Sequence, residues 1–375
     1  MPNTHGIVEE CGASLVGVME AEQVSTSSDA VLVSSRPART GGFVTLAELQ
    51  RRSQQNPTNY LVDSLLPAES VNVGVGDSGI GKTALAYQLG LSVATGTPFL
   101  GYRVNRGPVL YYDMENNQED IIRAGSALCR HIGTPPFPDD FLVLPDDCQT
   151  VRLEEAMADH HPALVIIDTL RAYRPTATKT NEDTGQFLQE VKRAIQENPC
   201  AVFLLHHTRK AGNNPVPALE DTPTGEWLEQ ASGARALVNL TNTRFAFAAP
   251  DGRRGYADET ALIMKLMVKV RGESAPFYLK RVLDADGEPL GYERLTGLSL
   301  ISNPAIGQAY RDLPHQFRFS EAKRAFNLTD DPTNKWLAKL AAVGVLEKAG
   351  RGLYRKIDPV ESVESIENLP IPIAA

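Results

Sequence analysis

Residues 76 to 83 read Gly76-Asp77-Ser78-Gly79-Ile80-Gly81-Lys82-Thr83, which fits the pattern G-x-x-x-x-G-K-[ST] without deviation. A short apolar run, Val71-Asn72-Val73-Gly74-Val75, precedes this octapeptide, and a helical pattern from Thr83 to Thr95 follows it. In such a strand–loop–helix context a glycine-rich loop turns its backbone N–H groups toward phosphate oxygens. The stretch therefore predicts a phosphate-binding loop in an α/β fold, with a glycine-rich turn that binds nothing as the alternative.

The residue types of this loop suit a nucleoside triphosphate and its metal ion. The glycines let the backbone approach the phosphates, so all eight positions are expected to bind ATP: Gly76, Asp77, Ser78, Gly79, Ile80, Gly81, Lys82 and Thr83. Lys82 supplies a positive charge to the outer phosphates and so counts as catalytic. Thr83 offers a hydroxyl ligand to Mg²⁺.

Apolar runs alternate with helical patterns along the first two thirds of the chain. The expected strands lie at 71–75, 108–112, 141–144, 163–167 and 201–205, and the expected helices at 83–95, 118–132, 153–159 and 184–197. Near-continuous apolar strands separated by helices indicate a parallel sheet that is buried on both faces. After Arg244 the pattern predicts antiparallel strands at 244–249, 261–271 and 275–279.

Two acidic residues follow expected strands and are candidates for the chemistry. Asp168 ends the run Ala163-Leu164-Val165-Ile166-Ile167, at the sheet edge where α/β proteins bind ligands, and is expected to hold Mg²⁺ with Thr83. Glu115 lies just beyond the strand ending at Tyr112, where a carboxylate can polarise the water that attacks the γ-phosphate. Asp113 is the competing candidate, and Glu115 as a solvated loop acid is the second alternative.

The order of four segments carries a family resemblance. They are Leu65-Leu66-Pro67, Leu110-Tyr111-Tyr112-Asp113-Met114-Glu115, Ile166-Ile167-Asp168-Thr169-Leu170 and Phe203-Leu204-Leu205-His206-His207-Thr208-Arg209-Lys210. With the phosphate loop they resemble the RecA-like P-loop ATPases of the RepA-type AAA ATPase subgroup, which contains a plasmid hexameric helicase and is related to the DnaB replicative helicases. The resemblance spans roughly residues 58 to 280. It implies a RecA-like fold, ATP and Mg²⁺ as ligands, action on DNA and assembly into a homo-oligomer such as a hexamer.

The resemblance also implies roles for residues away from the phosphate loop. His207 takes the position that senses the γ-phosphate, with a pair of core-edge histidines as the alternative. A neighbouring subunit completes the family's active site with cations, and Lys269 and Arg271 are the preferred candidates because K-x-R spacing on a strand puts both on one face. Arg235 and Arg244 are the other candidates for this trans-acting arginine, and a solvated strand edge is the alternative for Lys269 and Arg271.

The loop from Gly212 to Trp227 departs from the helicase pattern. It contains three prolines together with the acids Glu220, Asp221 and Glu226, whereas a loop that translocates DNA should be basic. No primase or zinc-binding module is visible in the sequence.

The segment 312–357 has nine Lys and Arg residues against five Asp and Glu residues. Ser320 is expected to cap one helix and Asp330 with Asp331 a second one, in which Trp336, Leu337 and Leu340 share a face while Lys335 and Lys339 occupy another. Residues 343–348 and 353–356 then read as a β-hairpin. The segment resembles a small C-terminal winged helix-turn-helix domain that binds DNA, and protein binding is the alternative.

Composition sets the remaining expectations. The 375 residues are 42% hydrophobic and 22% charged, which is typical of a globular protein, and the net charge of −9 confines any DNA contact to local basic patches. Four scattered cysteines argue against zinc or disulfides, and the absence of a long apolar run argues against membrane association, so a cytoplasmic protein is expected. We expect a mobile extension at 1–44, the ATPase domain at 45–300, the winged-helix-like domain at 312–357 and an acidic disordered tail at 358–375.

These observations favour an oligomeric Mg-dependent ATPase that acts on DNA as a replicative helicase or a mobile-element replication ATPase. An ATP-switched DNA-binding regulator is the second hypothesis. A recombination or defence ATPase that assembles on DNA without unwinding it is the third.

Overall fold

The computed structural model describes residues 43–55, 59–134, 137–145, 151–209, 217–219, 222–231, 235–249, 262–268, 272–274, 276–285, 289–295, 304–342 and 345–357. The predicted acidic tail at 358–375, and the predicted N-terminal extension apart from residues 43 and 44, lie outside these ranges. Among the described helices, none is long and apolar enough to cross a membrane.

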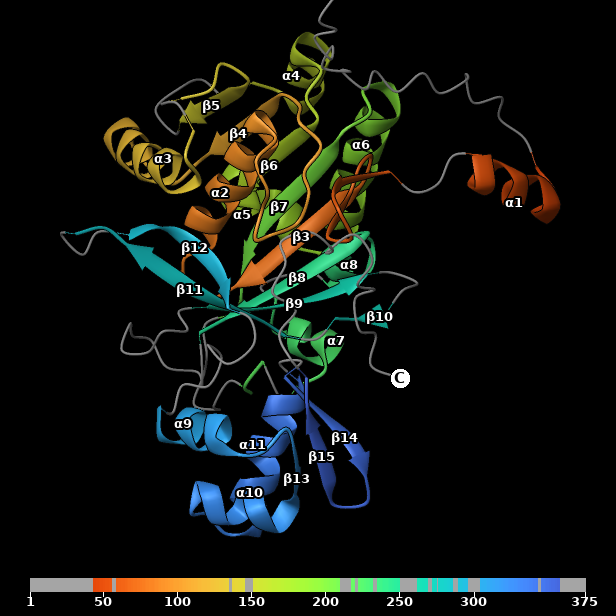
Figure 1. Ribbon diagram of the computed structural model, residues 1–375. Helices are drawn as coiled ribbons and strands as arrows, with labels where there is room; N and C mark the ends of the chain where they lie inside the picture. The colour runs from red at the N-terminus through yellow and green to blue at the C-terminus, as the bar shows by residue number, and fades with distance from the viewer. Residues whose placement is uncertain are drawn as a thin grey trace, which may run out of the picture. The chain divides into compact units, whose positions relative to one another are not determined.

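A ten-stranded mixed sheet forms the centre of the ATPase region (Figure 1). Its main path runs β12-β11-β9-β8-β3-β7-β6-β4-β5, and β10 (Gly272–Glu273) pairs with β9. The parallel strands are β3 (Val71–Gly76), β4 (Val109–Asp113), β5 (Phe141–Pro145), β6 (Leu164–Asp168), β7 (Ala201–His207) and β8 (Thr243–Ala248), and the antiparallel ones are β9 (Leu262–Val268), β11 (Phe277–Leu283) and β12 (Pro289–Leu295). The predicted α/β fold with a mostly parallel central sheet is confirmed.

Two details of the sheet differ from the sequence prediction. β8 was expected to be antiparallel, but it pairs in parallel with β3 and only its other edge is antiparallel, to β9. The pattern of one strand does not encode the direction of its partner, which explains the error. β12 was not predicted, because Pro289 and Gly291 interrupt its apolar pattern.

Helices cover both faces of the sheet and bury alternate residues of each strand. α2 (Lys82–Thr95) and α3 (Gln118–Ile132) contribute to the core on one face, which includes Val109 and Tyr111 of β4. α4 (Leu153–His160) and α6 (Asn181–Glu197) contribute to the other, which includes Leu110 and Tyr112. The shorter elements are α1 (Leu46–Gln55), β1 (Tyr60–Val62), β2 (Leu66–Pro67), α5 (Leu170–Tyr173), α7 (Thr224–Trp227) and α8 (Arg235–Asn239), with 3-10 turns at Pro175–Thr178 and Leu228–Gln230.

Strand register brings the predicted site residues to one edge of this sheet. In the parallel pairs Gly76 lies opposite His207, and Asp113 lies opposite Asp168. The four strands β3, β7, β6 and β4 are consecutive neighbours, so the loops at their carboxyl ends form a continuous surface. This is the edge at which α/β folds bind ligands.

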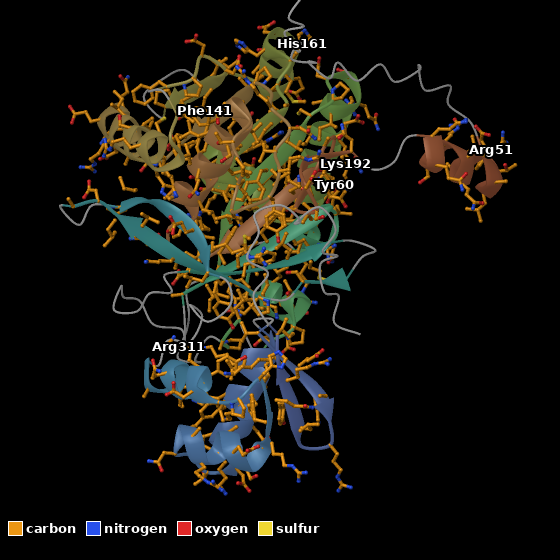
Figure 2. All side chains as sticks on the ribbon, viewed as in Figure 1. Arg51, Tyr60, Phe141, His161, Lys192 and Arg311 are labelled. Atoms are coloured by element: carbon orange, nitrogen blue, oxygen red, sulfur yellow. The ribbon has the colours of Figure 1, made fainter. Side chains whose placement is uncertain are left out.

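Two helices of the ATPase region, α1 and α3, begin with side-chain caps. The Asn117 side chain accepts a hydrogen bond of 3.0 Å from the Asp120 backbone N–H at the start of α3. The Thr45 hydroxyl accepts one of 3.1 Å from the Glu48 backbone N–H ahead of α1. On the same helix Arg51, labelled in Figure 2, forms an exposed ion pair with Glu48.

The C-terminal elements have a hydrophobic core of their own. In chain order they are α9 (Pro304–Asp312), β13 (Gln316–Arg318), α10 (Phe319–Phe326), α11 (Asp330–Ala342), β14 (Leu346–Gly350) and β15 (Leu353–Lys356). The strands pair in the antiparallel order β13-β15-β14. Tyr310, Phe317, Phe326 and Leu340 are among the residues buried between the helices and this sheet.

Two local expectations for this segment need correction. Ser320 lies inside α10 rather than capping it, because the helix starts at Phe319 and the Arg318 backbone N–H donates to the Glu321 carboxylate at 2.6 Å. β13 was not predicted, since three residues are too few to show a period.

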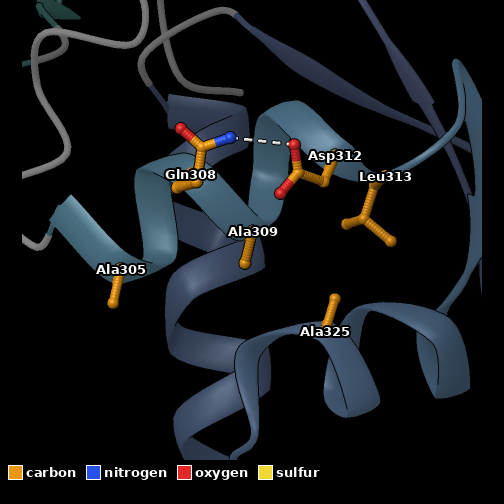
Figure 3. A pocket seen from close by; sticks show the side chains of 6 residues that line it. All are labelled: Ala305, Gln308, Ala309, Asp312, Leu313 and Ala325. Carbon is orange, nitrogen blue, oxygen red and sulfur yellow. Dashed lines mark hydrogen bonds between the residues drawn. The ribbon is translucent and has the colours of Figure 1, made fainter.

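A pocket of about 420 Å³ lies between α9 and α10 (Figure 3). Three of its six lining residues are alanine, and its two polar residues pair with each other, since Gln308 donates a hydrogen bond of 2.8 Å to Asp312. No cluster of ionisable side chains lines this pocket.

Candidate active site

The phosphate loop connects β3 to α2 and has the backbone that its glycines predict. Gly79 and Gly81 adopt positive φ angles of 76° and 101°, a left-handed conformation that side chains disfavour. The Ser78 backbone N–H is held at 2.8 Å by the Asp77 carboxylate. The N-terminus of α2, which directly follows the loop, is therefore suited to bind an anion.

Lys82 lies folded over this loop. Its side chain is buried, and its Nζ donates a hydrogen bond of 2.6 Å to the Asp77 carbonyl oxygen while lying 3.5 Å from Nδ1 of His207. Burial lowers the pKa of the Lys82 ammonium, and the nearby carboxylates of Asp168, Glu115 and Asp77 oppose that shift. The Lys82 ammonium therefore lies between the phosphate loop and the end of β7. We expect the phosphates of a bound nucleotide to occupy this space.

Asp168 ends β6 and is almost fully buried. Its Oδ2 accepts a hydrogen bond of 2.9 Å from the Tyr111 hydroxyl, and its Oδ1 is buried without a hydrogen-bond partner among the described residues. Burial raises the pKa of Asp168 to about 6, although hydrogen bonding from Thr83 and Tyr111 acts in the opposite direction. The carboxylate therefore has one oxygen that needs a partner.

A magnesium ion fits the donors that the chain offers here. Mg²⁺ prefers oxygen ligands and usually takes only one or two from the protein, the others coming from phosphates and water. The buried Oδ1 of Asp168 and the nearby Thr83 hydroxyl are oxygens of this kind. Within the described ranges no group of three or more His, Cys, Asp and Glu residues could hold a metal on its own.

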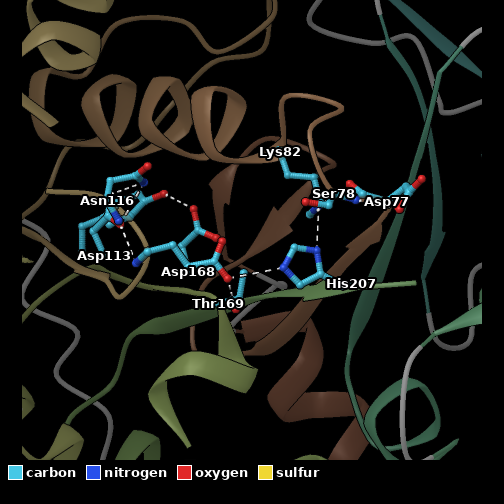
Figure 4. Close-up of polar contacts among 10 residues, drawn as sticks. Asp77, Ser78, Lys82, Asp113, Asn116, Asp168, Thr169 and His207 are labelled. Carbon is cyan, nitrogen blue, oxygen red and sulfur yellow. Dashed lines mark hydrogen bonds and ion pairs between the residues drawn. The ribbon is translucent and has the colours of Figure 1, made fainter. Parts of the chain in front are cut away.

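Glu115 lies in the loop after β4 and is hydrogen-bonded from two sides. Its two partners, Thr169 and His207, are labelled in Figure 4. The Thr169 hydroxyl donates to its Oε1 at 2.8 Å, and Nε2 of His207 lies 3.4 Å from the same oxygen. Hydrogen bonding from His207 lowers the pKa of the Glu115 carboxyl, against the effect of burial, and Thr169 and the charge of Lys82 add to the lowering. A half-exposed carboxylate held in this way is suited to accept a proton from water.

Asp113, the competing candidate, has a different environment. It is fully buried and accepts hydrogen bonds from the Tyr87 hydroxyl at 2.7 Å, from the Asn116 side chain at 3.0 Å and from the backbone N–H groups of Glu115 and Asn116. These bonds fix the loop that carries Glu115. The two acids therefore differ in position. Asp113 fixes the conformation of the loop after β4, whereas Glu115 lies near enough to Lys82 of the phosphate loop to be affected by its charge.

The two histidines at the end of β7 also differ. His206 is fully buried, whereas His207 is partly exposed and touches both Lys82 and Glu115. His207 therefore lies between Lys82 of the phosphate loop and Glu115 of the loop after β4.

Thr169 is the site residue that sequence reasoning missed. It is buried, it follows Asp168 through a cis peptide bond, and its hydroxyl fixes Glu115. The available signal was a hydroxyl residue directly after the acid that ends β6, at the same edge of the sheet as Glu115.

Of the four candidate trans-acting cations, the structure describes Arg235 and Arg244. Lys269 and Arg271, the preferred pair, lie outside the described residues. Arg244 is buried in the sheet, with a nitrogen 3.5 Å from the sulfur of Met267, and burial lowers its pKa. Its guanidinium thus lies within the protein rather than on its surface. Arg235 is exposed at the start of α8 and lies 3.4 Å from the Glu229 carboxylate.

This fold and this arrangement of side chains define a P-loop ATPase. The phosphate loop between β3 and α2, the buried acid on β6 and the acid after β4 are its defining parts. Residues 37–213 match the model of a family described as an AAA domain, which supports a nucleotide-binding, ATP-hydrolysing P-loop domain. No curated protein matches the chain.

Proposed function

We propose that the chain is a Mg-dependent ATPase that acts on DNA as a homo-oligomer, such as a hexamer, in the manner of RepA- and DnaB-type replicative helicases or mobile-element replication ATPases. The observation that carries this proposal is the position of His207, 3.5 Å from Lys82 and 3.4 Å from Glu115. Because His207 ends β7, a change in the bound phosphates that moves His207 would also act on the segment that follows β7.

The chain's own residues account for hydrolysis as follows. Lys82 exchanges its bond to the Asp77 carbonyl for the outer phosphates, and His207 donates a hydrogen bond to the γ-phosphate. Glu115, fixed by Thr169, orients water and accepts its proton as the water attacks in line. Thr83 and Asp168 would hold Mg²⁺, which would supply positive charge next to the phosphates. Arg271 and Lys269 of a neighbouring subunit are proposed to stabilise the charge on the transferred phosphoryl group.

Backbone contacts beyond His207 support a relay from the site. The Thr208 N–H donates a hydrogen bond of 3.2 Å to the carbonyl of Gly76 at the start of the phosphate loop. The Arg209 N–H donates one of 2.7 Å to the carbonyl of Gln230. A displacement of His207 on phosphate loss would therefore be passed to the segments on both sides of the following loop.

The C-terminal elements support a DNA-binding role. Their order of helix, strand, two helices and a hairpin resembles that of a winged helix-turn-helix, and we propose α11 as its recognition helix. Lys335 is exposed on α11, and Nζ of Lys339 lies 5.2 Å from the Trp336 ring centre. Exposed basic residues on the β14–β15 hairpin are Lys348, Arg351 and Arg355, the last paired with Glu347.

An ATP-switched DNA-binding regulator is the second candidate. Two sequence features favour it: the acids Glu220, Asp221 and Glu226 in the loop that a motor would use on DNA, and the concentration of basic residues in the C-terminal segment. In this account ATP sets the oligomeric state, and α11 finds the DNA site.

One experiment separates the two candidates. ATP turnover is measured with and without single-stranded DNA, beside unwinding of a forked duplex by the same preparation, with Lys82→Ala as the inactive control. Stimulation by single strands together with unwinding supports the motor. A rate of ATP turnover that single-stranded DNA does not change, without unwinding of the duplex, supports the regulator. No turnover in either condition would overturn both.

A further inference from the structure

The β11–β12 hairpin, at one end of the sheet, contacts the phosphate loop. The β11–β12 hairpin places Arg281 directly opposite Tyr292 in antiparallel register, and β12 packs against α2 and α3. The two residues are about two hundred positions away from the loop in sequence, and neither belongs to the motifs that define the ATPase.

The side chain of Gln88 holds β12 in place on α2. Its amide nitrogen donates a hydrogen bond of 2.8 Å to the Tyr292 carbonyl, and its amide oxygen accepts one of 2.8 Å from the Tyr292 N–H. A ring nitrogen of His131 on α3 lies 3.3 Å from the same carbonyl. The backbone of Tyr292 is therefore fixed to the two helices nearest the phosphate loop.

This anchoring inserts the Tyr292 side chain against Gly81. Tyr292 is 1% exposed, and its hydroxyl lies 3.4 Å from the Gly81 carbonyl oxygen. A Cβ atom added to Gly81 would lie only 1.8 Å from that hydroxyl, so the position accepts glycine alone. Gly81 thus serves both the turn of the loop and the close approach of Tyr292.

Arg281 extends beside Tyr292 to the same point. One guanidinium nitrogen lies 3.2 Å from the Tyr292 hydroxyl and 3.2 Å from the position that a Gly81 Cβ would take. The guanidinium carbon lies 5.8 Å from the Tyr292 ring centre. A guanidinium beside a phosphate loop is suited to pair with phosphate oxygens through two parallel hydrogen bonds.

We propose that Arg281 binds the phosphates of the nucleotide held by its own subunit, and that Tyr292 is the positioning residue that directs it there. The inference rests on the proposed nucleotide-binding function and adds a cation in cis to Lys82. It also gives the β11–β12 hairpin a direct contact with bound nucleotide.

The test measures affinity of the full-length chain for fluorescent ADP and ATP, and for inorganic pyrophosphate by competition. Arg281→Ala should weaken all three about tenfold or more, as expected for losing a charged hydrogen bond. Lys280→Ala is the matched control, because it removes the same charge from the adjacent exposed position of β11 and should leave affinity within twofold. Tyr292→Phe should weaken binding less than Arg281→Ala, and Arg281→Lys should restore only part of it.

The outcomes distinguish this inference from the function on which it rests. Wild-type affinity in Arg281→Ala, with binding lost in Lys82→Ala, overturns the inference and leaves the ATPase in place. Weaker binding of ADP and ATP by Arg281→Ala with unchanged pyrophosphate affinity would place Arg281 at the nucleoside rather than the phosphates and also overturn it. A wild-type chain that binds no nucleotide would overturn both proposals.

Discussion

The Thr169 hydroxyl donates a 2.8 Å hydrogen bond to Oε1 of Glu115, which links the residue after the β6 acid to the acid after β4. The bond crosses between two neighbouring strands and orients a carboxylate whose side chain is 43% exposed. His207 approaches the same oxygen, so both partners hold Glu115 through Oε1. The efficiency of Glu115 as a base should therefore depend on Thr169.

Thr169→Val tests this dependence directly. Valine keeps the shape of threonine but removes the donor, so Glu115 loses its orientation while the phosphate loop is untouched. We expect kcat for ATP hydrolysis to fall by about tenfold to a hundredfold, the scale of an ångström-sized misplacement. KM for ATP should stay within twofold, and Thr169→Ser should recover most of the rate. A valine variant with wild-type kcat would rule out the positioning role.

Asp113→Asn should act on stability. Asp113 is fully buried and accepts hydrogen bonds from a tyrosine hydroxyl, a side-chain amide and two backbone N–H groups, and an asparagine amide has only one acceptor oxygen for them. The loss of about 2 kcal/mol expected for such a group corresponds to a Tm lowered by roughly 4–8 °C in a domain of this size. Glu115→Gln, at a half-exposed position, should leave Tm unchanged. Equal melting temperatures for both variants would contradict the division of roles.

The trans-acting arginine can be assigned by comparing three substitutions. Arg271→Ala should retain nucleotide binding but lose about a thousandfold in turnover, the scale of an arginine finger. Arg244→Ala should instead lower stability, since that side chain is buried, and Arg235→Ala should change little. Normal turnover in Arg271→Ala together with a defect in Arg235→Ala would move the finger to the start of α8.

The C-terminal DNA contact makes a prediction about salt. Lys335→Ala and Lys339→Ala should each weaken DNA binding and reduce the slope of log affinity against log salt concentration by about one, as expected for one lost phosphate contact. Lys323→Ala is the control, because the Lys323 ammonium is paired with Asp330 at 2.5 Å. Unchanged slopes in all three variants would indicate that α11 contacts protein instead.

The parts of the site that could be predicted are those whose sequence pattern lies within a few consecutive residues. The phosphate loop shows in its own octapeptide, and Asp168 and Glu115 show because apolar strands end just before them. Since parallel strands bring their carboxyl ends to one edge, the meeting of these loops with His207 also followed. The sequence prediction preferred Glu115 with Asp113 as the competing candidate, and the structure adds that burial and hydrogen-bond partners distinguish the two acids.

The parts that could not be predicted depend on contacts between distant segments. Nothing near Gly81 in the sequence indicates that Tyr292 will lie against it, since that contact depends on how β12 packs on α2. The parallel pairing of β8 with β3 was missed for the same reason. Thr169 was overlooked because its importance comes from the carboxylate of Glu115, which belongs to another loop.

ATP turnover by Glu115→Gln, measured beside equilibrium ATP binding by the same protein, tests the central claim most directly. Glutamine keeps the size of glutamate and cannot accept the proton from water. The account predicts that binding stays within a few-fold of wild type while turnover falls to the level of Lys82→Ala. A Glu115→Gln protein that hydrolyses ATP at the wild-type rate would contradict the assignment of Glu115 as the catalytic base and the site built around it.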